Sequence, residues 1–592
     1  MSKERSYIYP ERINTYKKEQ KKYIRQLSFI SLLRLLLFVV FAWFLYTAFS
    51  IRFAGYDLAY SGLSITGFLF CVFWADGLKK KNTFLQQLIL INENENHIDK
   101  GLPFFLDNGA ALAPLKGFTV DLNVFGTHSL FHLLNRTGSK SGKKQLGDRL
   151  SEPFINPDDI KNYQVCIREL SGNIEFRQTL LAHTLLLEEG ETFSQLQSGI
   201  PEVFFVMLKS RAWSLLALCW PVAGVAIIFF SIWQDSYRLM LAFGIVGLLL
   251  LSFIFKKVNL LYDHISKRSH LYNQYAQCFQ LISNEKFEHP YLLQKQEEIK
   301  HAGQAFQRLS RLVGLFDLRL SVISVVINGL FLFDLLCARA YMKWSSKHQA
   351  AIKKWFDTMG EMELLNSLAT FHYNHPHFIF PECTEDRLLI KAKAMGHPLM
   401  DESVAVVNDI SIGEPAKLHL ITGSNMSGKS TFLRTVGLNI ILAQLGAPVF
   451  AQTFVFRPVR LLTSFHHIDS LEDSTSYFYA ELKCLQSIIE SLTKPTPALV
   501  LLDEVMRGTN SKDKHDGTAL LIQKILNYSC LSLIATHDTE LGVLAENHPG
   551  AIENFSFESE LSDKGLFFDF TMRKGIAQTK NATYLMQKMG II

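Results

Sequence analysis

Long stretches without charged side chains dominate the pattern in the first half of the chain. The four stretches are residues 27–50 (interrupted only by Arg34), 58–75, 212–234 and 239–255. A helix that crosses a bilayer needs about 20 apolar residues, with about 17 as the lower limit. Because the stretches come in pairs joined by short polar turns, we predict two transmembrane hairpins, at residues 27–78 and 212–255, rather than helices buried in a soluble domain.

Basic residues lie on one side of these stretches. They precede the first and third stretches and follow the second and fourth, at Lys17, Lys18, Lys21, Lys22, Arg25, Lys79, Lys80, Lys81, Lys209, Arg211, Lys256 and Lys257. The turns inside the two hairpins carry only one basic and one acidic residue each. By the positive-inside rule, this asymmetry predicts an integral protein of the inner or cell membrane with four spans. Both termini, including an N-terminal segment of residues 1–26, are then cytoplasmic.

The segments outside the hairpins have helical periodicity. Residues 79–211 and 256–384 place apolar residues three and four positions apart and contain few Gly or Pro. We therefore predict an all-α domain in two parts. A fifth apolar run, residues 320–333, has only 14 uncharged residues before Asp334. Since this is too short to cross a bilayer, we interpret it as a buried helix of the soluble domain.

Near residue 385 the pattern changes to short apolar runs that alternate with helices. Residues 417–422, 498–502 and 531–536 have the composition of buried strands, and each is followed by polar residues. Strands that alternate with helices predict a mostly parallel α/β sheet over residues 385–592. Ligands of such sheets bind beyond the carboxyl ends of the strands, which is where the polar residues fall.

The first of these strands leads into a sequence that matches the phosphate-binding pattern Gly-x4-Gly-Lys-Ser, with a helix predicted from Thr431 to about Leu445. Glycines let such a loop wrap so that backbone N–H groups point at phosphates, and the helix N-terminus adds positive potential. We expect Lys429 to reach the β- and γ-phosphates of ATP and the Ser430 hydroxyl to bind Mg²⁺. The predicted ATP-binding residues are Gly423, Ser424, Asn425, Met426, Ser427, Gly428, Lys429, Ser430 and Thr431.

Residues suited to ATP hydrolysis follow the other two strands. Asp503 closes the second strand and suits the Mg²⁺ shell, and the adjacent Glu504 suits activation of the attacking water. His537 ends the third strand, where a histidine can sense or polarise the γ-phosphate. We therefore predict a Mg²⁺-dependent ATPase with Glu504, His537 and Lys429 as catalytic residues and with Ser430 and Asp503 as metal ligands.

The composition of the chain gives no independent support for a nucleic-acid partner, a disulfide framework or a zinc site. The chain has 60 basic and 55 acidic residues, and this balance does not by itself indicate a nucleic-acid partner. Its eight cysteines are scattered without a Cys-x-x-Cys pair, so they indicate neither a disulfide framework nor a zinc site.

Several motifs of the last 200 residues resemble the MutS family. Residues 422–434, with Asn-Met inside the phosphate loop, resemble the MutS phosphate loop. Residues 501–509 followed by Asp516-Gly517 resemble the MutS acidic motif, and residues 535–541 resemble its histidine motif. Further matches are Gly396-His397-Pro398, Asn408-Asp409, the tail from Phe567 to Ala582 and, more weakly, the segment from Leu130 to Pro153. The resemblance implies an ABC/MutS-type ATPase domain at residues 385–592 and a helical core with lever helices before it.

The resemblance also implies a homodimer through the ATPase heads. Residues 469–478, followed by Glu481, resemble the MutS segment whose serine contacts ATP across the dimer. On that match, Ser476 binds the nucleotide held by the partner chain. Each composite site would then combine Lys429 and Glu504 of one chain with Ser476 of the other.

The resemblance is absent from the regions where MutS reads DNA. The first hairpin stands where the family has mismatch-reading and connector domains, and the second interrupts the region where the DNA clamp normally lies. The basic residues near Thr509 (Arg507, Lys512 and Lys514) are interpreted as part of a solvated loop. We therefore predict a membrane-anchored MutS-like ATPase in which nucleotide-driven head dimerisation moves lever helices, with ATP and membrane lipid as partners. Membrane-tethered DNA mismatch repair or DNA binding, and an ABC-type transport ATPase, are the alternatives.

Overall fold

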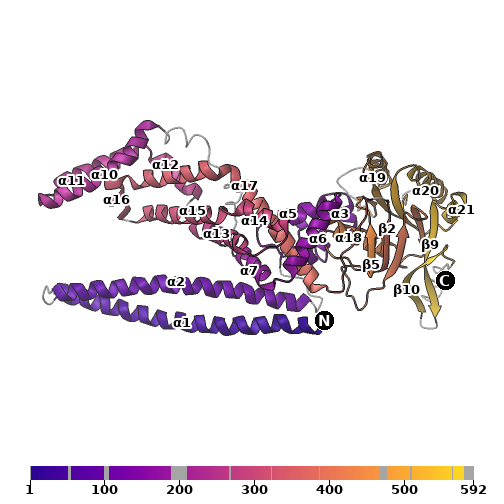
Figure 1. Ribbon diagram of the computed structural model, residues 1–592, viewed down its shortest axis with the longest axis horizontal. Helices are drawn as coiled ribbons and strands as arrows, with labels where there is room; N and C mark the ends of the chain where they lie inside the picture. The colour runs from indigo at the N-terminus through magenta and orange to yellow at the C-terminus, as the bar shows by residue number, and fades with distance from the viewer. Residues whose placement is uncertain are drawn as a thin grey trace.

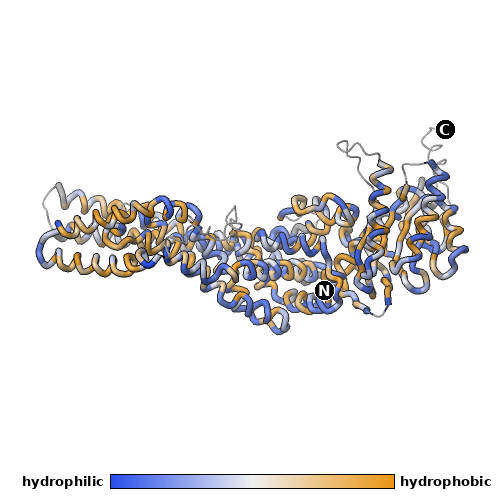
Figure 2. The backbone as a smooth tube through the Cα atoms, turned by 90° about the horizontal axis from the view of Figure 1, so that it is seen from above, coloured by the Kyte–Doolittle hydropathy of each residue, from blue (hydrophilic) through white to orange (hydrophobic). Residues whose placement is uncertain are grey.

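The structure, a computed structural model, describes residues 2–50, 55–98, 106–187, 210–265, 268–321, 323–385, 387–465, 477–506, 510–562 and 565–578. The molecule is elongated, with long helices at one end, a mixed α/β domain at the other and shorter helices between them (Figure 1). Coloured by hydropathy, the part of the molecule at the first end is mostly hydrophobic (Figure 2). We call this region the apolar end.

The first hairpin consists of α1 (Ser2–Ser50) and α2 (Gly55–Ile98), which lie side by side (Figure 1). Both helices continue far beyond the apolar stretches. The N-terminal segment that was predicted as a separate unit is therefore, from Ser2 onward, the first half of α1. In the apolar half, large side chains such as Trp43 and Phe73 are 65% and 76% exposed. By length and composition, both helices are able to cross a membrane.

The second hairpin consists of α10 (Arg211–Trp233) and α11 (Arg238–Ser252), and α12 (Phe255–Ile265) follows at a bend of 72°. Leu218, Val222 and Phe229 on α10 are each about 70% exposed. A soluble monomer rarely exposes a continuous apolar surface of this kind. Helix α10 is also long and apolar enough to cross a membrane.

The fifth apolar run does not form the buried helix that was predicted from the sequence. After η2 (Leu318–Leu320) the chain turns by 111° into α16 (Ile323–Phe331). One face of α16 packs against the second hairpin, but Ile323, Val325 and Val326 on the other face are 67%, 54% and 59% exposed. The interpretation as a buried helix of a soluble domain is therefore wrong, and α16 belongs to the apolar end.

The helical core connects the two ends of the molecule, as predicted for an all-α domain. Its elements are η1 (Ala110–Leu112), α3 (Phe118–Asp121), α4 (Leu130–Leu134), α5 (Lys140–Ser151), α6 (Pro157–Ser171), α7 (Ile174–Leu185), α12, α13 (Ser269–Asn284), α14 (Pro290–Ile299), α15 (Ala302–Asp317) and α17 (Phe333–Asn374). The 42-residue helix α17 runs from the apolar end to the α/β domain (Figure 1). Its Glu363 accepts hydrogen bonds from the backbone N–H groups of Gly138 (2.8 Å) and Ser139 (3.2 Å) and from the Ser139 hydroxyl. Because Ser139 caps α5, this carboxylate fixes the start of α5 to α17.

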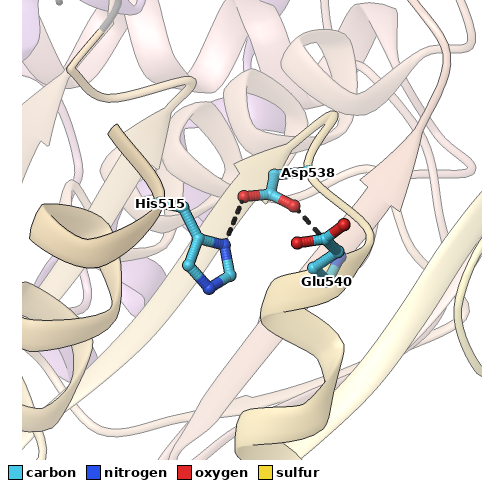
Figure 3. Close-up of side chains that lie close together, drawn as sticks. All are labelled: His515, Asp538 and Glu540. Atoms are coloured by element: carbon cyan, nitrogen blue, oxygen red, sulfur yellow. Dashed lines mark hydrogen bonds and ion pairs between the residues drawn. The ribbon is translucent and has the colours of Figure 1, made fainter. Parts of the chain in front are cut away.

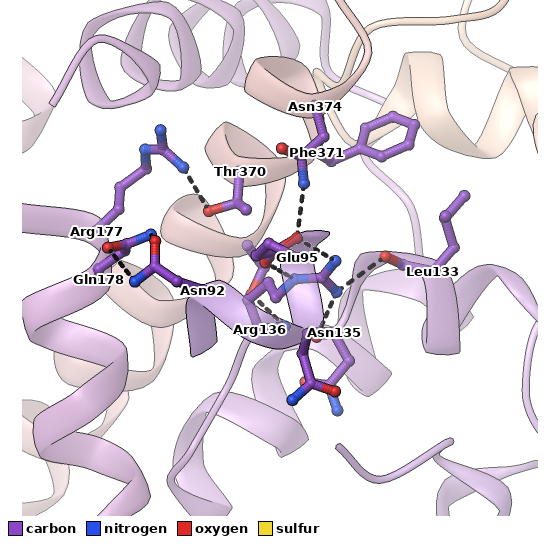
Figure 4. Close-up of polar contacts among 12 residues, drawn as sticks. Asn92, Glu95, Leu133, Asn135, Arg136, Arg177, Gln178, Thr370, Phe371 and Asn374 are labelled. Carbon is purple, nitrogen blue, oxygen red and sulfur yellow. Dashed lines mark hydrogen bonds and ion pairs between the residues drawn. The ribbon is translucent and has the colours of Figure 1, made fainter. Parts of the chain in front are cut away.

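A buried polar network joins the base of the first hairpin to this core (Figure 4). Glu95 near the end of α2 accepts hydrogen bonds from Arg136 Nε (2.5 Å) and Nη2 (3.2 Å) and from Asn374 Nδ2 (2.9 Å). The side chains of Glu95 and Arg136 are only 2% and 4% exposed. Asn92 of α2 and Gln178 of α7 exchange two amide hydrogen bonds, each 2.9 Å long. The first hairpin is therefore attached to both α7 and the end of α17.

The α/β domain contains two sheets. The six-stranded sheet has the order β10-β9-β4-β8-β7-β6, in which every pair is parallel except β9–β10. This confirms the predicted mostly parallel sheet. A four-stranded sheet, order β1-β5-β2-β3, was not predicted; three of its strands precede β4 in the chain, and β5 lies between β4 and β6. The strands are β1 (Glu382–Cys383), β2 (Ile390–Met395), β3 (Asn408–Ile412), β4 (Leu418–Gly423), β5 (Thr453–Phe456), β6 (Arg460–Ser464), β7 (Ala498–Asp503), β8 (Cys530–Thr536), β9 (Ile552–Ser562) and β10 (Gly565–Lys574).

Helices flank the six-stranded sheet: α18 (Lys429–Gln444), α19 (Tyr477–Leu492), α20 (Ser511–Ile525), η3 (Glu540–Val543) and α21 (Leu544–Asn547). The helical core touches α18 directly. Arg434 Nε donates to the carbonyl oxygen of Asp121 (3.1 Å), and Gln444 Nε2 donates to that of Phe154 (2.8 Å). One continuous hydrophobic cluster also includes Ala217 of the second hairpin, much of the core and Val436 of α18. Packing therefore extends without a break from the second hairpin to the helix that follows the phosphate loop.

Candidate nucleotide site

The phosphate-loop sequence lies between β4 and α18, in the strand-loop-helix arrangement that was predicted. Gly428 has φ 106° and forms the N-cap of α18, a backbone conformation that favours glycine. A Cβ at that position would lie 3.1 Å from Cδ1 of Phe570 on β10, so the loop is also closely packed. Of the other predicted residues, Asn425, Met426 and Thr431 are exposed at the surface, and Ser427 is buried.

Lys429 is held against the loop that precedes it. Its Nζ donates to the carbonyl oxygens of Gly423 and Ser424, both at 2.8 Å, and its side chain is only 4% exposed. The hydroxyls of Ser424 and Ser427 are buried and have no hydrogen-bond partner within the described part of the chain. A buried polar group without a hydrogen-bond partner is energetically costly. The two hydroxyls and the Lys429 ammonium group are therefore available to bind the polyphosphate that the sequence pattern predicts here.

Asp503 has the surroundings expected of a ligand for a hard cation. It ends β7 and is 3% exposed, and both of its carboxylate oxygens lack a hydrogen-bond partner among the described residues. An unpaired buried carboxylate is unfavourable unless a cation binds it. Mg²⁺ prefers oxygen ligands and uses one or two protein carboxylates or hydroxyls together with phosphate oxygens. Asp503 and Ser430, which lies in the first turn of α18, fit that requirement.

Glu504 and His537 face each other across two neighbouring strands. The carboxylate Oε2 of Glu504 lies 3.6 Å from Nδ1 of His537. Glu504 has φ 47°, an uncommon conformation for a non-glycine residue, and its N–H donates to the carbonyl oxygen of Ala535 on β8 (2.9 Å). Backbone strain of this kind persists only where the surrounding structure enforces it. The strained turn thus places the carboxylate at the end of the sheet where ligands of such folds bind.

A second basic residue joins this pair. Nζ of Lys514, on the first turn of α20, lies 3.4 Å from Nε2 of His537. Lys514 therefore lies on a helix rather than in the predicted loop, and its side chain is next to the predicted catalytic histidine, in an exposed contact. Lys512 is exposed, and Arg507 lies outside the described residues. The contact joins residues that are 23 positions apart, so no local pattern pointed to it.

A hydrogen-bonded group fixes the first turn of α20 next to His537 (Figure 3). Nδ1 of His515 pairs with Oδ2 of Asp538 at 2.8 Å, and Oδ1 of Asp538 accepts the N–H of Glu540 at 3.0 Å. The Asp538 carboxylate raises the pKa of His515 above its usual value. His515, Asp538 and Glu540 each offer a ligand atom within 4.8 Å of the others. Since both Asp538 oxygens already accept hydrogen bonds, we interpret the group as a structural link between α20 and the loop after β8.

Other residues of the predicted motifs lie next to the site and hold its backbone in place through hydrogen bonds. Glu481 on α19 accepts the backbone N–H of Met506 (2.5 Å), which holds the turn after Glu504. Asn408 donates to the carbonyl oxygen of Phe570 (3.0 Å) and accepts the N–H of Met572 (2.7 Å), so it fixes the part of β10 that covers Gly428. Burial, with a contribution from Arg434, lowers the pKa of His397 to about 4. Ser476 lies outside the described residues.

Comparisons with known proteins agree with this geometry. A family profile for MutS domain V matches residues 419–590. The DNA mismatch repair protein MutS of Thermotoga sp. (strain RQ2) is 33% identical over 251 residues, which cover 41% of this chain and 30% of that protein. DNA mismatch repair protein MutS 2 of Halobacterium salinarum is 34% identical over 199 residues (33% of this chain, 23% of that protein), and human MutS protein homolog 4 is 29% identical over 245 residues (40% and 25%). The chain thus spans less than a third of the length of these curated relatives. The nucleotide site described above therefore lies in a region that is similar to the fifth, ATPase domain of MutS proteins.

Proposed function

We propose that this protein is a membrane-anchored, Mg²⁺-dependent ATPase in which ATP-driven pairing of two α/β domains moves the helical core and the membrane hairpins. One observation carries the proposal. A MutS-type nucleotide site and a set of exposed apolar helices stand at opposite ends of one molecule, and continuous packing that includes α17 joins them. The nucleotide site is thereby connected to the apolar end through packed side chains, which can transmit a change of shape at the site.

The hydrolytic step follows from the residues of the site. Backbone N–H groups of the loop and Lys429 would bind the phosphates of ATP, and Ser430 and Asp503 would hold Mg²⁺, which would supply positive charge near the phosphates. The Glu504 carboxylate accepts a proton from the attacking water, and His537, at 3.6 Å, orients that carboxylate or contacts the γ-phosphate. Because both Asp503 and Glu504 are at least nine-tenths buried, their interactions with a cation and with water are stronger than they would be in bulk solvent.

The membrane part of the proposal rests on exposed apolar area. Two helices of the first hairpin and one of the second are long and apolar enough to span a bilayer, and the bent pair of α11 and α12 adds a fourth candidate. Their large side chains face outward, as lipid contact requires. By the positive-inside rule, the basic flanks favour a cytoplasmic location of the α/β domain, where ATP is available.

DNA binding is the second candidate, and it rests on the relatives alone, since those proteins are named for DNA mismatch repair. The family profile matches residues 419–590, which lie outside both hairpins. The same comparisons favour a MutS-like protein over an ABC-type transporter, which we do not propose.

The proposal is tested with the full-length protein in lipid nanodiscs. We expect Mg²⁺-dependent ATP hydrolysis that Lys429→Ala abolishes through loss of nucleotide binding. Addition of mismatched DNA should leave the rate unchanged, and a strong stimulation by DNA would instead support the second candidate. Absence of ATP binding by the intact protein would refute both.

Trans action of Ser476 is tested by mixing variants. Ser476→Ala and Lys429→Ala chains are each expected to be inactive as homodimers. A mixed dimer contains one composite site in which Lys429 and Ser476 are both intact, so mixing should restore part of the activity. No restoration, with dimers formed, would show that Ser476 does not act across the interface.

A further inference from the structure

Helix α16 packs into the second hairpin through contacts that only glycine allows. A Cβ on Gly247 of α11 would overlap the carbonyl oxygen of Gly329, and a Cβ on Gly224 of α10 would overlap that of Leu330. The indole Nε1 of Trp220 donates to the carbonyl oxygen of Gly329 at 3.2 Å. Small residues at such positions let helix backbones approach closely, which is the usual way in which helices associate inside a bilayer.

The position of these contacts along α10 gives the depth of α16 in a bilayer that α10 crosses. Trp220 and Gly224 lie nine and thirteen residues after Arg211, or about 14 and 20 Å along the helix at 1.5 Å per residue. The hydrocarbon core of a bilayer is about 30 Å thick. If α10 crosses the membrane, the end of α16 therefore lies near the middle of the hydrocarbon core.

The segment is too short to cross the bilayer from that position. Helix α16 has nine residues and is about 14 Å long. Leu332 follows it with φ 51°, and α17 then leads back to the core. Arg339 on α17 donates to Ser214 Oγ (2.8 Å) near the start of α10, so the chain has returned to the level at which α10 begins. The segment enters and leaves on the same side.

A buried ion pair connects the chain before α16 to the chain after it. Nε of Arg319, before α16, lies 2.8 Å from Oδ2 of Asp334, after it, and the two side chains are 9% and 8% exposed. Asn328 Oδ1 accepts the N–H of Asp334 (2.8 Å), and the Ser324 hydroxyl donates to the carbonyl oxygen of Arg319 (2.8 Å). The ion pair and these hydrogen bonds are made within the protein, as a membrane environment demands, while Nη1 of Arg319 and Oδ1 of Asp334 are buried without a hydrogen-bond partner among the described residues.

We propose that residues 318–321 and 323–333 belong to a re-entrant membrane segment, whose outward face contacts the acyl chains of the cytoplasmic leaflet. Leu320, Ile323, Val325 and Val326 form this face and are 54–70% exposed. The face continues the apolar surface of α10 and α11. This inference rests on the proposed membrane insertion of the second hairpin. It makes α17 a helix that begins inside the lipid layer and ends at the α/β domain.

Spin labelling of the full-length protein in phospholipid vesicles tests the inference. In a background with Cys219, Cys383 and Cys484 changed to serine, a nitroxide is attached to Val326→Cys. Its collision rates with oxygen, which concentrates in lipid, and with a water-soluble nickel chelate are compared. We expect oxygen to dominate at Val326, as it should at Leu218→Cys on α10, and nickel to dominate at Val404→Cys, which is 73% exposed on the α/β domain.

The two controls separate the possible failures. Nickel accessibility at Val326 with oxygen dominance at Leu218 would refute the re-entrant segment and leave the membrane anchor intact. Nickel accessibility at both positions would refute the membrane anchor itself. If Val326→Cys does not fold, Ile323→Cys and Val325→Cys give the same test, because both side chains lie on the same outward face.

Discussion

The buried pair of Glu95 and Arg136 allows a quantitative test of how firmly the first hairpin is attached to the core. Glu95→Ala leaves the Arg136 guanidinium, which is 4% exposed, without its carboxylate and removes the acceptor for Asn374. Removing one partner of a buried pair typically costs about 3–5 kcal/mol. We expect the free energy of unfolding of the hairpin–core unit to fall by that amount.

A neighbouring pair on the same helix provides the control. Glu93 of α2 pairs with Lys17 of α1 at 2.6 Å, but the two side chains are 38% and 49% exposed. Exposed pairs contribute about 0–1 kcal/mol, so Glu93→Ala should have little effect. Replacing both buried partners with apolar residues, as Glu95→Leu with Arg136→Met, should recover most of the loss, because no uncompensated charge remains.

Tryptophan fluorescence during urea unfolding in detergent measures this difference. The seven tryptophans (Trp43, Trp74, Trp213, Trp220, Trp233, Trp344 and Trp355) all lie in the hairpins or in α17 and none in the α/β domain. The signal therefore reports the region that the substitution affects, and ATP binding checks that the α/β domain is still folded. If Glu95→Ala costs no more than Glu93→Ala, the pair does not attach the hairpin as we infer.

Three further predictions concern the nucleotide site. Glu504→Gln should bind ATP normally but lower kcat by about 10²–10⁴-fold, which is the range for loss of a general base. If a single-turnover assay shows hydrolysis at the wild-type rate in this variant, Glu504 is not the base. Lys514→Ala should lower kcat several-fold with little change in nucleotide affinity, whereas Lys512→Ala, at an exposed position, should not; equal rates for both would show that the contact with His537 is unimportant. The His515–Asp538 pair is expected to stabilise the α/β domain below the usual histidine pKa of about 6.5 and to lose this effect as pH rises through the raised pKa of His515. Thermal unfolding of the protein as a function of pH should show this loss, and Asp538→Asn should remove it; an unchanged profile in that variant would contradict the assignment.

The elements that hold the phosphates were predictable because the signals are local. The predicted strands at residues 417–422, 498–502 and 531–536 agree with β4, β7 and β8 to within about a residue, and α18 begins two residues before its predicted start. Fully buried parallel strands are continuous apolar runs, and the functional residues follow them directly in the chain.

The remaining features depend on contacts between distant residues. Arg136 and Glu95 are 41 positions apart, and Lys514 and His537 are 23 apart, so neither pair leaves a periodic pattern. For residues 320–333, length alone suggested a soluble helix. The glycines that admit α16 to the second hairpin lie about 80 and 105 residues earlier in the chain, and only the folded structure brings them together.

The unbroken length of α17 has a geometric consequence. Its 42 residues form a rod of about 63 Å, and Glu363 and the neighbouring contacts to α5 lie near its α/β end. A rotation of about 10° around that end would carry the tip at α16 sideways by about 11 Å, roughly the diameter of a helix. If the proposed pairing of two α/β domains rotates α17 by this angle, the tip at α16 moves by about one helix diameter in the proposed membrane region.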